Sequence, residues 1–395
     1  MITKFGSLFA GHVDLDNLGW EGTPANDRRY SNDHLATVFD KTIAIATLMD
    51  RVGYDTFWMA EHHFQHEGYE CIPNIMQLSV HMAHLTDNIK FGCGFNIAPM
   101  WHPLRMAEDY ATADILTGGR MIFGVGRGYH TREVEVFGNP MLDADANRDL
   151  FEEQVDVIMK AFKHESFSHH GKNYDIPPDV PYRGYDLKEI TLVPRPVNPV
   201  ETWQPIVSAS ERGLNFMAKH GIKGIIGGGA AVGGAALTVL EAWQKAQADH
   251  GIETELGGNV ILGLSYHIAE TVEKAIEEAR PFYEENMKMF APLGFVRGLT
   301  DDQLDALGDP KRAPHAGLPT LEQAVEAGSW LVGTPESIKE KLEDIGERLP
   351  GLVEVNMGNP VGTPQSVLLE QLEAFGTEVM PHFKGRVPAE APADD

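Results

Sequence analysis

The chain alternates between short apolar runs and longer segments with helical periodicity. In the longer segments apolar residues recur every three to four positions, whereas the short runs are continuously apolar, which is typical of strands buried on both faces. Strands are predicted at 5–10, 56–60, 89–95, 121–125, 205–209, 222–226, 260–268 and 352–357. Helices are predicted at 35–52, 74–85, 104–116, 150–162, 212–220, 236–250, 272–289, 335–349 and 366–375.

This alternation of strand and helix predicts a parallel sheet covered by helices. Both a closed barrel and an open doubly wound sheet fit the pattern. A dinucleotide-binding fingerprint would favour the open sheet, but Gly124-Val125-Gly126-Arg127-Gly128-Tyr129 lacks its third glycine. We therefore predict a (β/α)8 TIM barrel.

Two segments interrupt the pattern. The first, 166–204, is rich in proline, tyrosine and histidine, and it predicts a small hairpin. The second, 291–319, contains prolines and glycines and fits either a lid or an ordinary surface excursion. We predict a single barrel domain over 1–380 with these two insertions, followed by a C-terminal tail at 381–395.

Composition and charge narrow the function classes. With 58 acidic and 32 basic side chains the formal net charge is −26, which repels nucleic acids and anionic membranes. We expect no membrane span, because no apolar run is long enough for one, and no signal peptide, because no apolar stretch follows Lys4. Two cysteines, Cys71 and Cys93, are too few for a disulfide framework. We expect a soluble, cytoplasmic protein with neither nucleic-acid nor membrane partners.

The first candidate for chemistry is Ala60-Glu61-His62-His63-Phe64, directly after the second predicted strand. Residues at that point of a barrel face the catalytic mouth, where an imidazole can act as acid or base. Neighbouring side chains on an extended chain point to opposite sides, so at most one of the two histidines faces the mouth. The alternative is that they cap the strand or pair with a carboxylate. No catalytic metal is expected, because the local histidine spacing matches no known zinc pattern.

Two further segments suit a phosphate or a flat cofactor. In Gly124–His130 the glycines permit close approach to the backbone and Arg127 supplies a forked positive charge. In Val207-Ser208-Ala209-Ser210-Glu211 a strand becomes a helix, and free N–H groups at a helix start bind anions. The alternatives are a tight turn with a surface arginine and an ordinary helix cap.

Taken in order, these segments resemble the bacterial-luciferase-like family of flavin-dependent monooxygenases, which includes the luciferase α chain (alkanal monooxygenase). The similarity is strongest from Pro99 to Gly138, and Glu61-His62-His63-Phe64 also matches the family. Each segment alone is weak, but the ordered set is specific and extends over about residues 1–380. It includes His102-Pro103-Leu104-Arg105-Met106-Ala107-Glu108-Asp109, Phe123–His130, Phe137-Gly138, Val193-Pro194-Arg195-Pro196 and Gly333-Thr334-Pro335-Glu336-Ser337.

The resemblance implies a mechanism and a set of partners. An NAD(P)H:flavin reductase would supply reduced FMN, and a flavin peroxide formed with O2 would oxygenate a small apolar organic substrate. His62 would be the catalytic acid/base, and the protein would be a homodimer. Cofactor contacts would come from Ala60, Glu61, Asn96, Gly126, Arg127, Tyr129, Ser208, Ala209 and Ser210, and the substrate pocket from Phe64, Met100 and Trp101.

Two positions depart from the luciferase pattern. Gly126 stands where luciferase has a reactive cysteine, and Ala209 stands where it has a glutamate. The first departure argues against light emission more than against oxygenation. A deazaflavin-dependent oxidoreductase on the same fold and a non-catalytic flavin-binding subunit are the alternative functions. Aldehydes, terpenes, ketones and sulfur compounds are all handled on this scaffold, so epoxidation, hydroxylation and Baeyer–Villiger chemistry stay open.

Overall fold

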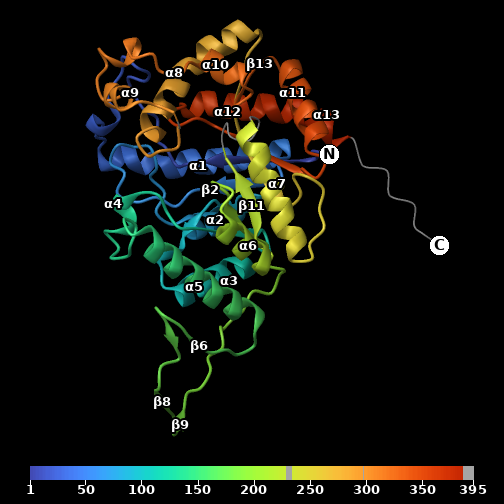
Figure 1. The fold of residues 1–395 in the computed structure, drawn as a ribbon. Coiled ribbons are helices and arrows are strands. Elements are labelled where there is room, and N and C mark those ends of the chain that lie inside the picture. Colours follow the sequence, from blue (N-terminus) through green and yellow to red (C-terminus); the bar gives the residue numbers. More distant parts are fainter. Residues whose placement is uncertain (228–233, 297, 386–395) are drawn as a thin grey trace, which may run out of the picture.

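A computed structural model describes residues 1–227, 234–296 and 298–385 (Figure 1). Within these ranges parallel strands close into a barrel in the order β10-β11-β12-β14-β1-β2-β3-β5, and β5 pairs again with β10. The predicted (β/α)8 barrel is therefore confirmed. Its strands are β1 (Lys4–Phe9), β2 (Thr56–Met59), β3 (Lys90–Cys93), β5 (Met121–Gly126), β10 (Thr202–Pro205), β11 (Lys223–Ile226), β12 (Val260–Ile268) and β14 (Glu354–Gly358).

Helices surround the barrel on the outside (Figure 1). The longest, α1, is capped by Ser31 and ends at Gly53, where a φ of 86° favours glycine, as the sequence predicted. The principal helices are α1 (Asn32–Val52), α2 (Ile75–Ala83), α3 (Pro103–Leu116), α5 (Ala144–Lys163), α6 (Glu211–His220), α7 (Gly234–Asp249), α8 (Val272–Phe290), α11 (Pro335–Arg348), α12 (Gln365–Ala374) and α13 (Met380–Lys384).

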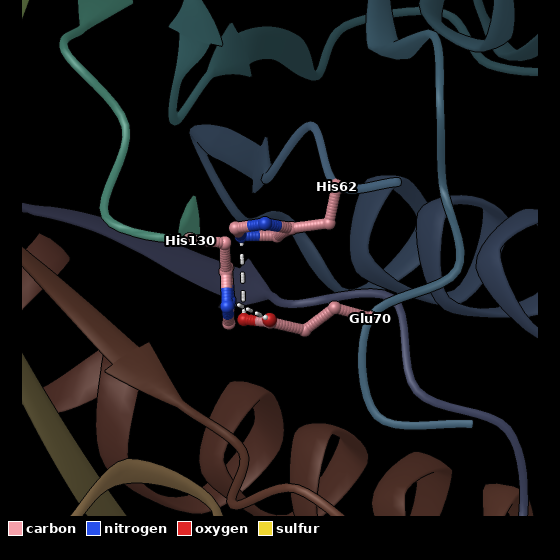
Figure 2. A group of neighbouring side chains, drawn as sticks. All are labelled: His62, Glu70 and His130. Atoms are coloured by element: carbon pink, nitrogen blue, oxygen red, sulfur yellow. Dashed lines mark hydrogen bonds and ion pairs between the residues drawn. The ribbon is translucent and has the colours of Figure 1, made fainter. Parts of the chain in front are cut away.

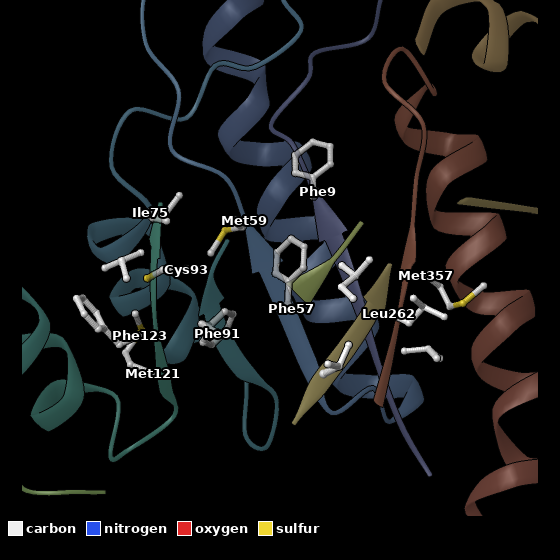
Figure 3. Packing of buried hydrophobic residues seen from close by; sticks show 14 of the residues in the cluster. Phe9, Phe57, Met59, Ile75, Phe91, Cys93, Met121, Phe123, Leu262 and Met357 are labelled. Carbon is white, nitrogen blue, oxygen red and sulfur yellow. The ribbon is translucent and has the colours of Figure 1, made fainter. Parts of the chain in front are cut away.

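The core has two layers because successive strand residues point to opposite faces. Inside the barrel, Trp58 packs with Trp203 and with isoleucines of three other strands. Gly92 makes room for this, since a Cβ there would lie 2.3 Å from the Trp58 ring. Between the strands and the helices lies the larger layer, which includes Phe57 and Phe91 (Figure 3). The two layers fix the direction of each strand end, and so of the loops that carry the site.

Two strand predictions were wrong in detail. The strand predicted at 205–209 is β10, Thr202–Pro205, because Thr202 and Trp203 pair with β5 while Val207 is exposed. A further strand, β13 (Trp330–Gly333), was missed. It pairs with the last four residues of β12 beside the closed barrel, so tertiary pairing rather than local periodicity defines it.

The two segments predicted as insertions carry short elements of their own. The first contains two hairpins where one was predicted, β6 (His169–His170) with β7 (Asp175–Ile176) and β8 (Pro181–Tyr182) with β9 (Tyr185–Asp186), and these project from the barrel (Figure 1). The last residues of this segment belong to barrel strand β10. The second contains α9 (Asp301–Ala306) and the short helix η4 (Ala313–His315), and α10 (Leu321–Glu326) follows it. Of the predicted tail, 386–395 lies outside the described residues. No helix in the described ranges is long and apolar enough to cross a membrane.

Candidate active site

The loops that follow β2, β3, β5 and β10 meet at one end of the barrel, because the carboxyl ends of parallel strands lie together. Three short elements shape these loops: β4 (Asn96–Ile97), the short helix η2 (Ala98–Met100) and α4 (Thr131–Val134). The residues that the sequence singled out after β2, β3, β5 and β10 are therefore brought to one mouth.

Glu61 ties the loop after β2 to the loop after β3. Its buried carboxylate accepts hydrogen bonds from the Ile97 N–H at 2.8 Å and from Trp101 Nε1–H at 2.7 Å. It also lies 3.1 Å from His63 Nε2. With its side chain committed to these contacts, Glu61 serves to fix the backbone around His62.

His62 is buried, with 3% of its surface exposed, and both of its ring nitrogens have partners. Nδ1 lies 3.2 Å from each carboxylate oxygen of Glu133, while Nε2 lies 3.0 Å from the Tyr129 hydroxyl and 3.3 Å from Glu70 Oε1. Burial lowers the pKa of His62, but the carboxylates of Glu70 and Glu133 outweigh it and leave that pKa above its ordinary value. The geometry therefore favours the imidazolium form.

Glu133, at the end of a short helix, is held ionised by the same contacts. Burial raises its pKa, but the hydrogen bond and positive charge of His62 lower it below the usual glutamate value. The Glu133 carboxylate also accepts the His63 backbone N–H at 3.0 Å and Gln65 Nε2–H at 3.3 Å. A single carboxylate thus holds three groups of the loop after β2.

Glu70 and His130 complete the cluster around His62 (Figure 2). Tyr129 donates its hydroxyl to Glu70 Oε1 at 2.7 Å, and His130 Nε2 lies 2.8 Å from Glu70 Oε2. The facing atoms of His62, Glu70 and His130 lie within 4.8 Å of one another, a spacing that a metal ion could bridge. Each atom already has a hydrogen-bond partner in the network, so the polar groups are satisfied among themselves.

His63 and Phe64 take a different direction from His62. The Phe64 backbone has a φ of 62° and its side chain is 50% exposed. It packs on Phe137 with ring centroids 5.6 Å apart, and Phe137 also contacts the His63 ring. The two histidine rings thus have different partners, His62 with Glu133 and Glu70 and His63 with Glu61, and Phe64 lies on the surface beside them.

The predicted substrate-pocket residues are thus spread over two loops. Met100 lies in η2, and Trp101 is fixed by Glu61 and accepts a hydrogen bond from Gln154 at its carbonyl. Phe295, from the second insertion, contacts Tyr129 with ring centroids 4.9 Å apart. The second insertion therefore reaches the site, while its action as a lid stays a prediction.

A second cluster, the arginine cradle, consists of Arg127, Arg148, Arg212 and Ser210. Burial lowers the pKa of Arg127, the positive charges of Arg148 and Arg212 lower it further, and Glu152 offsets part of this effect. Arg212 is neutralised by Asp149 and Glu152, at 2.8 and 2.7 Å. Arg127 has only Asn147 Oδ1, at 3.2 Å, and Arg148 forms no ion pair with any residue in the described ranges. The cradle therefore carries positive charge that the protein does not neutralise.

The cradle lies at the start of α6, where backbone N–H groups are free. Ser210 is the N-cap residue, and its Oγ accepts the Gly213 N–H at a long 3.5 Å. A Cβ built on Gly213 would lie 3.6 Å from Arg148 Nη1 and 3.7 Å from Ser210 Oγ. A helix start with a serine cap, where three arginines face the two carboxylates of Asp149 and Glu152, is suited to binding a phosphate.

Of the predicted site residues, several line the mouth without offering free polar groups. Asn96 donates its amide to the Gly124 carbonyl at 3.1 Å and is buried. Ala60 is buried, and Gly126 lies where a Cβ would be 3.3 Å from Phe95. Ser208 and Ala209 lie in the loop between β10 and α6 rather than on a strand. Their cofactor contacts stay predictions.

Sequence reasoning missed Glu70, Glu133 and Arg148. Glu133 follows the family-like Arg127 segment and is three residues after His130, so a carboxylate beside that segment was an available signal. Arg148 is on α5, far from any motif, and only the fold brings it to the first turn of α6. Glu70 lies seven positions after His63 in an irregular loop, where no periodicity indicates the direction of a side chain.

A parallel barrel with a buried histidine network and the arginine cradle at one mouth has the layout of a barrel enzyme, whose active site lies at the carboxyl ends of its strands. The profile of the luciferase-like monooxygenase family matches residues 19–350 of the chain. The chain therefore belongs to the luciferase-like monooxygenase family.

Curated relatives are similar over parts or most of the chain. Limonene 1,2-monooxygenase of Rhodococcus erythropolis is 26% identical over 345 residues, 85% of this chain and 79% of that protein. Uncharacterized protein y4vJ of Sinorhizobium fredii is 34% identical, but the match spans 36% of this chain and 39% of the relative. The oxygenase component of flavin-dependent trigonelline monooxygenase from Acinetobacter baylyi is 29% identical over 35% of this chain and 38% of that protein.

Solved structures share the fold over almost the whole chain. The oxygenating constituent of 3,6-diketocamphane monooxygenase of Pseudomonas putida, a complex with FMN, has a TM-score of 0.73 at 20% identity and covers 98% of this chain and 100% of that one. An F420-dependent secondary alcohol dehydrogenase has a TM-score of 0.63 at 15% identity and covers 97% and 99%. Both flavin and deazaflavin enzymes thus share this architecture.

Proposed function

We propose that the protein is an FMN-dependent monooxygenase that oxygenates a small organic molecule with O2 and reduced FMN supplied by a separate reductase. The observation that carries the proposal is the loop after β5. Arg127 of this loop belongs to the arginine cradle, and Tyr129, two residues later, contacts His62. One loop therefore joins a phosphate site to a buried acid/base group, as a phosphate-bearing cofactor with a reactive ring requires.

The chain's own residues divide the work between the two ends of this loop. Arg127, Arg148 and Ser210 would bind the phosphate, and the start of α6 would orient it. Bound FMN would supply the redox chemistry by which O2 is activated. His62 would hold a proton at its ring nitrogen close to the reacting groups, and the apolar surface of Trp101 and Met100 would exclude water. The reductase follows from the two-component naming of the trigonelline relative, and we expect a homodimer.

The experiment that tests the proposal combines binding with product analysis. The protein is given photoreduced FMN, 18O-labelled O2 and a panel of terpenes, ketones, aldehydes and sulfur compounds. We expect one atom of label in a product and tighter binding of FMN than of riboflavin. Absence of labelled product together with equal affinity for both flavins would contradict the proposal.

A variant of the same assay distinguishes the deazaflavin-dependent oxidoreductase from the proposed monooxygenase. Reduced F420 replaces reduced FMN, and a carbonyl substrate is offered without oxygen. A deazaflavin oxidoreductase would reduce the carbonyl by hydride transfer under these conditions, whereas the proposed monooxygenase would leave it unchanged. Turnover with F420 alone would therefore replace the proposed function.

A further inference from the structure

The contacts of His62 determine where its protons lie. His62 and the His63 N–H lower the pKa of Glu133, so its carboxylate is ionised and acts only as an acceptor, here of the His63 N–H and a Gln65 N–H. The His62 nitrogen that faces it at 3.2 Å, Nδ1, must therefore carry a hydrogen. This contact fixes the ring orientation and removes Nδ1 from any other role.

The opposite nitrogen faces a phenol that is already a donor. Tyr129 donates to Glu70 Oε1 at 2.7 Å, which turns a lone pair of its oxygen toward His62 Nε2 at 3.0 Å. Burial and the neighbouring Glu70 raise the pKa of Tyr129 well above its ordinary value, which keeps it a neutral phenol. Nε2 must then carry the second hydrogen, and neither ring nitrogen is free to accept a proton.

We propose that Tyr129 and Glu70 form a proton relay with His62, through which the Nε2 proton of His62 is stored on Glu70 and returned. This inference rests on the proposed function, because it explains how a fully engaged imidazole could change between its cationic and neutral forms during the reaction. Tyr129 is the bridging residue, because its contacts of 3.0 Å to His62 Nε2 and 2.7 Å to Glu70 Oε1 are shorter than the direct 3.3 Å approach of these two atoms. Glu70 is the proton store.

The step moves two protons and no electrons. The Nε2–H bond of His62 breaks as its proton passes to the Tyr129 oxygen, and the former Tyr129 O–H bond breaks as that proton passes to Glu70 Oε1. The products are a neutral His62, an unchanged phenol and a Glu70 carboxylic acid. His62 thereby becomes neutral and its Nε2 accepts a hydrogen bond from the new Tyr129 O–H, while the net charge of the buried cluster is unchanged.

The surroundings of His62 favour exchange within the cluster. The titratable groups that face it are Glu61 and Glu70 from the loop after β2, Tyr129 and His130 from the loop after β5, and Glu133 from α4. His62, Glu70 and Glu133 are each at most 3% exposed, and His130 is 8% exposed. His130 is hydrogen-bonded to the second oxygen of Glu70 and so keeps this carboxylate aligned with Tyr129 (Figure 2).

A flavin-free experiment tests the coupling. Protein with 15N-labelled histidines is titrated with pH in NMR, and His62 is assigned by its loss in His62→Gln. We expect both ring nitrogens to be protonated at neutral pH and the midpoint to fall by about 1–3 pH units in Glu70→Gln. The matched control is Glu67→Gln, since Glu67 lies in the same loop but pairs with Arg132 at 2.7 Å and should leave the midpoint unchanged.

Two outcomes of this titration overturn the relay. One is a His62 that is neutral at pH 7 or responds equally to Glu70→Gln and Glu67→Gln. The other is tight stoichiometric binding of Zn²⁺ to the wild-type protein that Glu70→Gln abolishes, because an ion would then replace the shared proton.

Turnover with reduced FMN and O2 tests whether the relay works in catalysis. We expect Tyr129→Phe and Glu70→Gln to lower the product-forming rate about 10²-fold with little change in KM, at the lower end of acid–base contributions. The rate in H2O/D2O mixtures should indicate two moving protons in the wild type and one in Tyr129→Phe. An unchanged rate and isotope dependence in Tyr129→Phe would contradict the relay. If wild-type protein forms no product but the titration behaves as expected, the proposed function fails and the proton coupling stands.

Discussion

The two ends of the loop after β5 differ in how their charges are compensated. At the His62 end, carboxylates, imidazoles and a phenol satisfy one another in a closed network that is buried before any ligand arrives. At the Arg127 end, the arginine cradle carries more positive charge than its neighbours neutralise. At the His62 end every polar group has a partner within the protein, which suits the exchange of protons among fixed groups. At the Arg127 end the excess positive charge suits a ligand that brings a negative charge.

Replacing His62 should give the largest effect. In His62→Gln the product-forming rate should fall about 10²–10⁴-fold, because the group that exchanges the proton is lost. FMN affinity should change little, since the phosphate is bound at the other end of the loop. Turnover and FMN fluorescence titration measure the two effects.

The matched control for this prediction is His66→Gln. His66 lies in the same loop with 37% of its side chain exposed, and its only ion-pair contact in the described ranges is Glu67. It should retain wild-type turnover. A His62→Gln enzyme that turns over like His66→Gln would remove His62 from the chemistry and erase the difference between the two ends.

Replacing Glu133, the carboxylate that faces His62 Nδ1, should lower the stability of the fold. Glu133→Gln should lower the free energy of unfolding by about 3 kcal/mol, because a buried charge pair loses one partner. The pKa of His62 is raised, so its contribution is present below about 6.5 and is lost as pH rises through the folded value. The pKa of Glu133 is lowered, so its contribution is lost as pH falls through a value below 4.5. The difference in free energy of unfolding between the wild type and Glu133→Gln should therefore be largest between about pH 4.5 and pH 6.5.

Urea unfolding at a series of pH values measures this difference. The exposed Glu340, changed to Gln, is the control and should show no such pH window. A difference that is constant across the pH range would mean that Glu133 acts by packing rather than by charge.

At the arginine cradle the effect should be on binding. Arg148→Ala or Arg127→Ala should raise the Kd for FMN about 10- to 100-fold, the range expected for a lost charge-assisted hydrogen bond. Riboflavin lacks the phosphate, so its Kd should change little. Added salt should reduce the difference in FMN Kd between the wild type and the variants, because a partly exposed ion pair is screened. Fluorescence titration with both flavins measures this.

The surface variant Arg51→Ala serves as control, since Arg51 pairs only with Glu373 in the described ranges and is 67% exposed at its side chain. It should leave both affinities unchanged. An equal loss of FMN and riboflavin binding in Arg148→Ala would show that Arg148 supports the loop rather than the phosphate.

Local sequence patterns predicted the barrel well because most of its strands are short and apolar and are followed by a helix with apolar residues on one face. The predictions failed where pairing with a neighbouring strand, rather than the local sequence, determines whether a segment is a strand. Trp330–Gly333 is a strand only because it extends β12, and Val207 looked like strand while lying exposed beyond β10. Neither fact is encoded in the period of the residues themselves.

The site divides in the same way. His62, Arg127 and Ser210 follow strand ends, so barrel topology alone places them at the mouth. Their partners Glu133 and Arg148 come from α4 and α5, and side-chain direction after the chain reverses decides their contacts. Sequence motifs thus identify the residues that the strand order places at the mouth. They miss the residues that reach the site only through the packing of helices and loops.

The smallest effect, at Ser210, separates helix capping from phosphate binding. Ser210→Ala should lower stability by about 1 kcal/mol through loss of the α6 cap and weaken FMN several-fold. Ser210→Asp keeps a good cap, so stability should recover, but its negative charge lies where the phosphate would bind. FMN affinity should therefore fall further in the aspartate variant while riboflavin affinity is retained. If stability and FMN affinity recovered together in Ser210→Asp, this end of the loop would be a structural cap, and the uncompensated arginines would need another explanation.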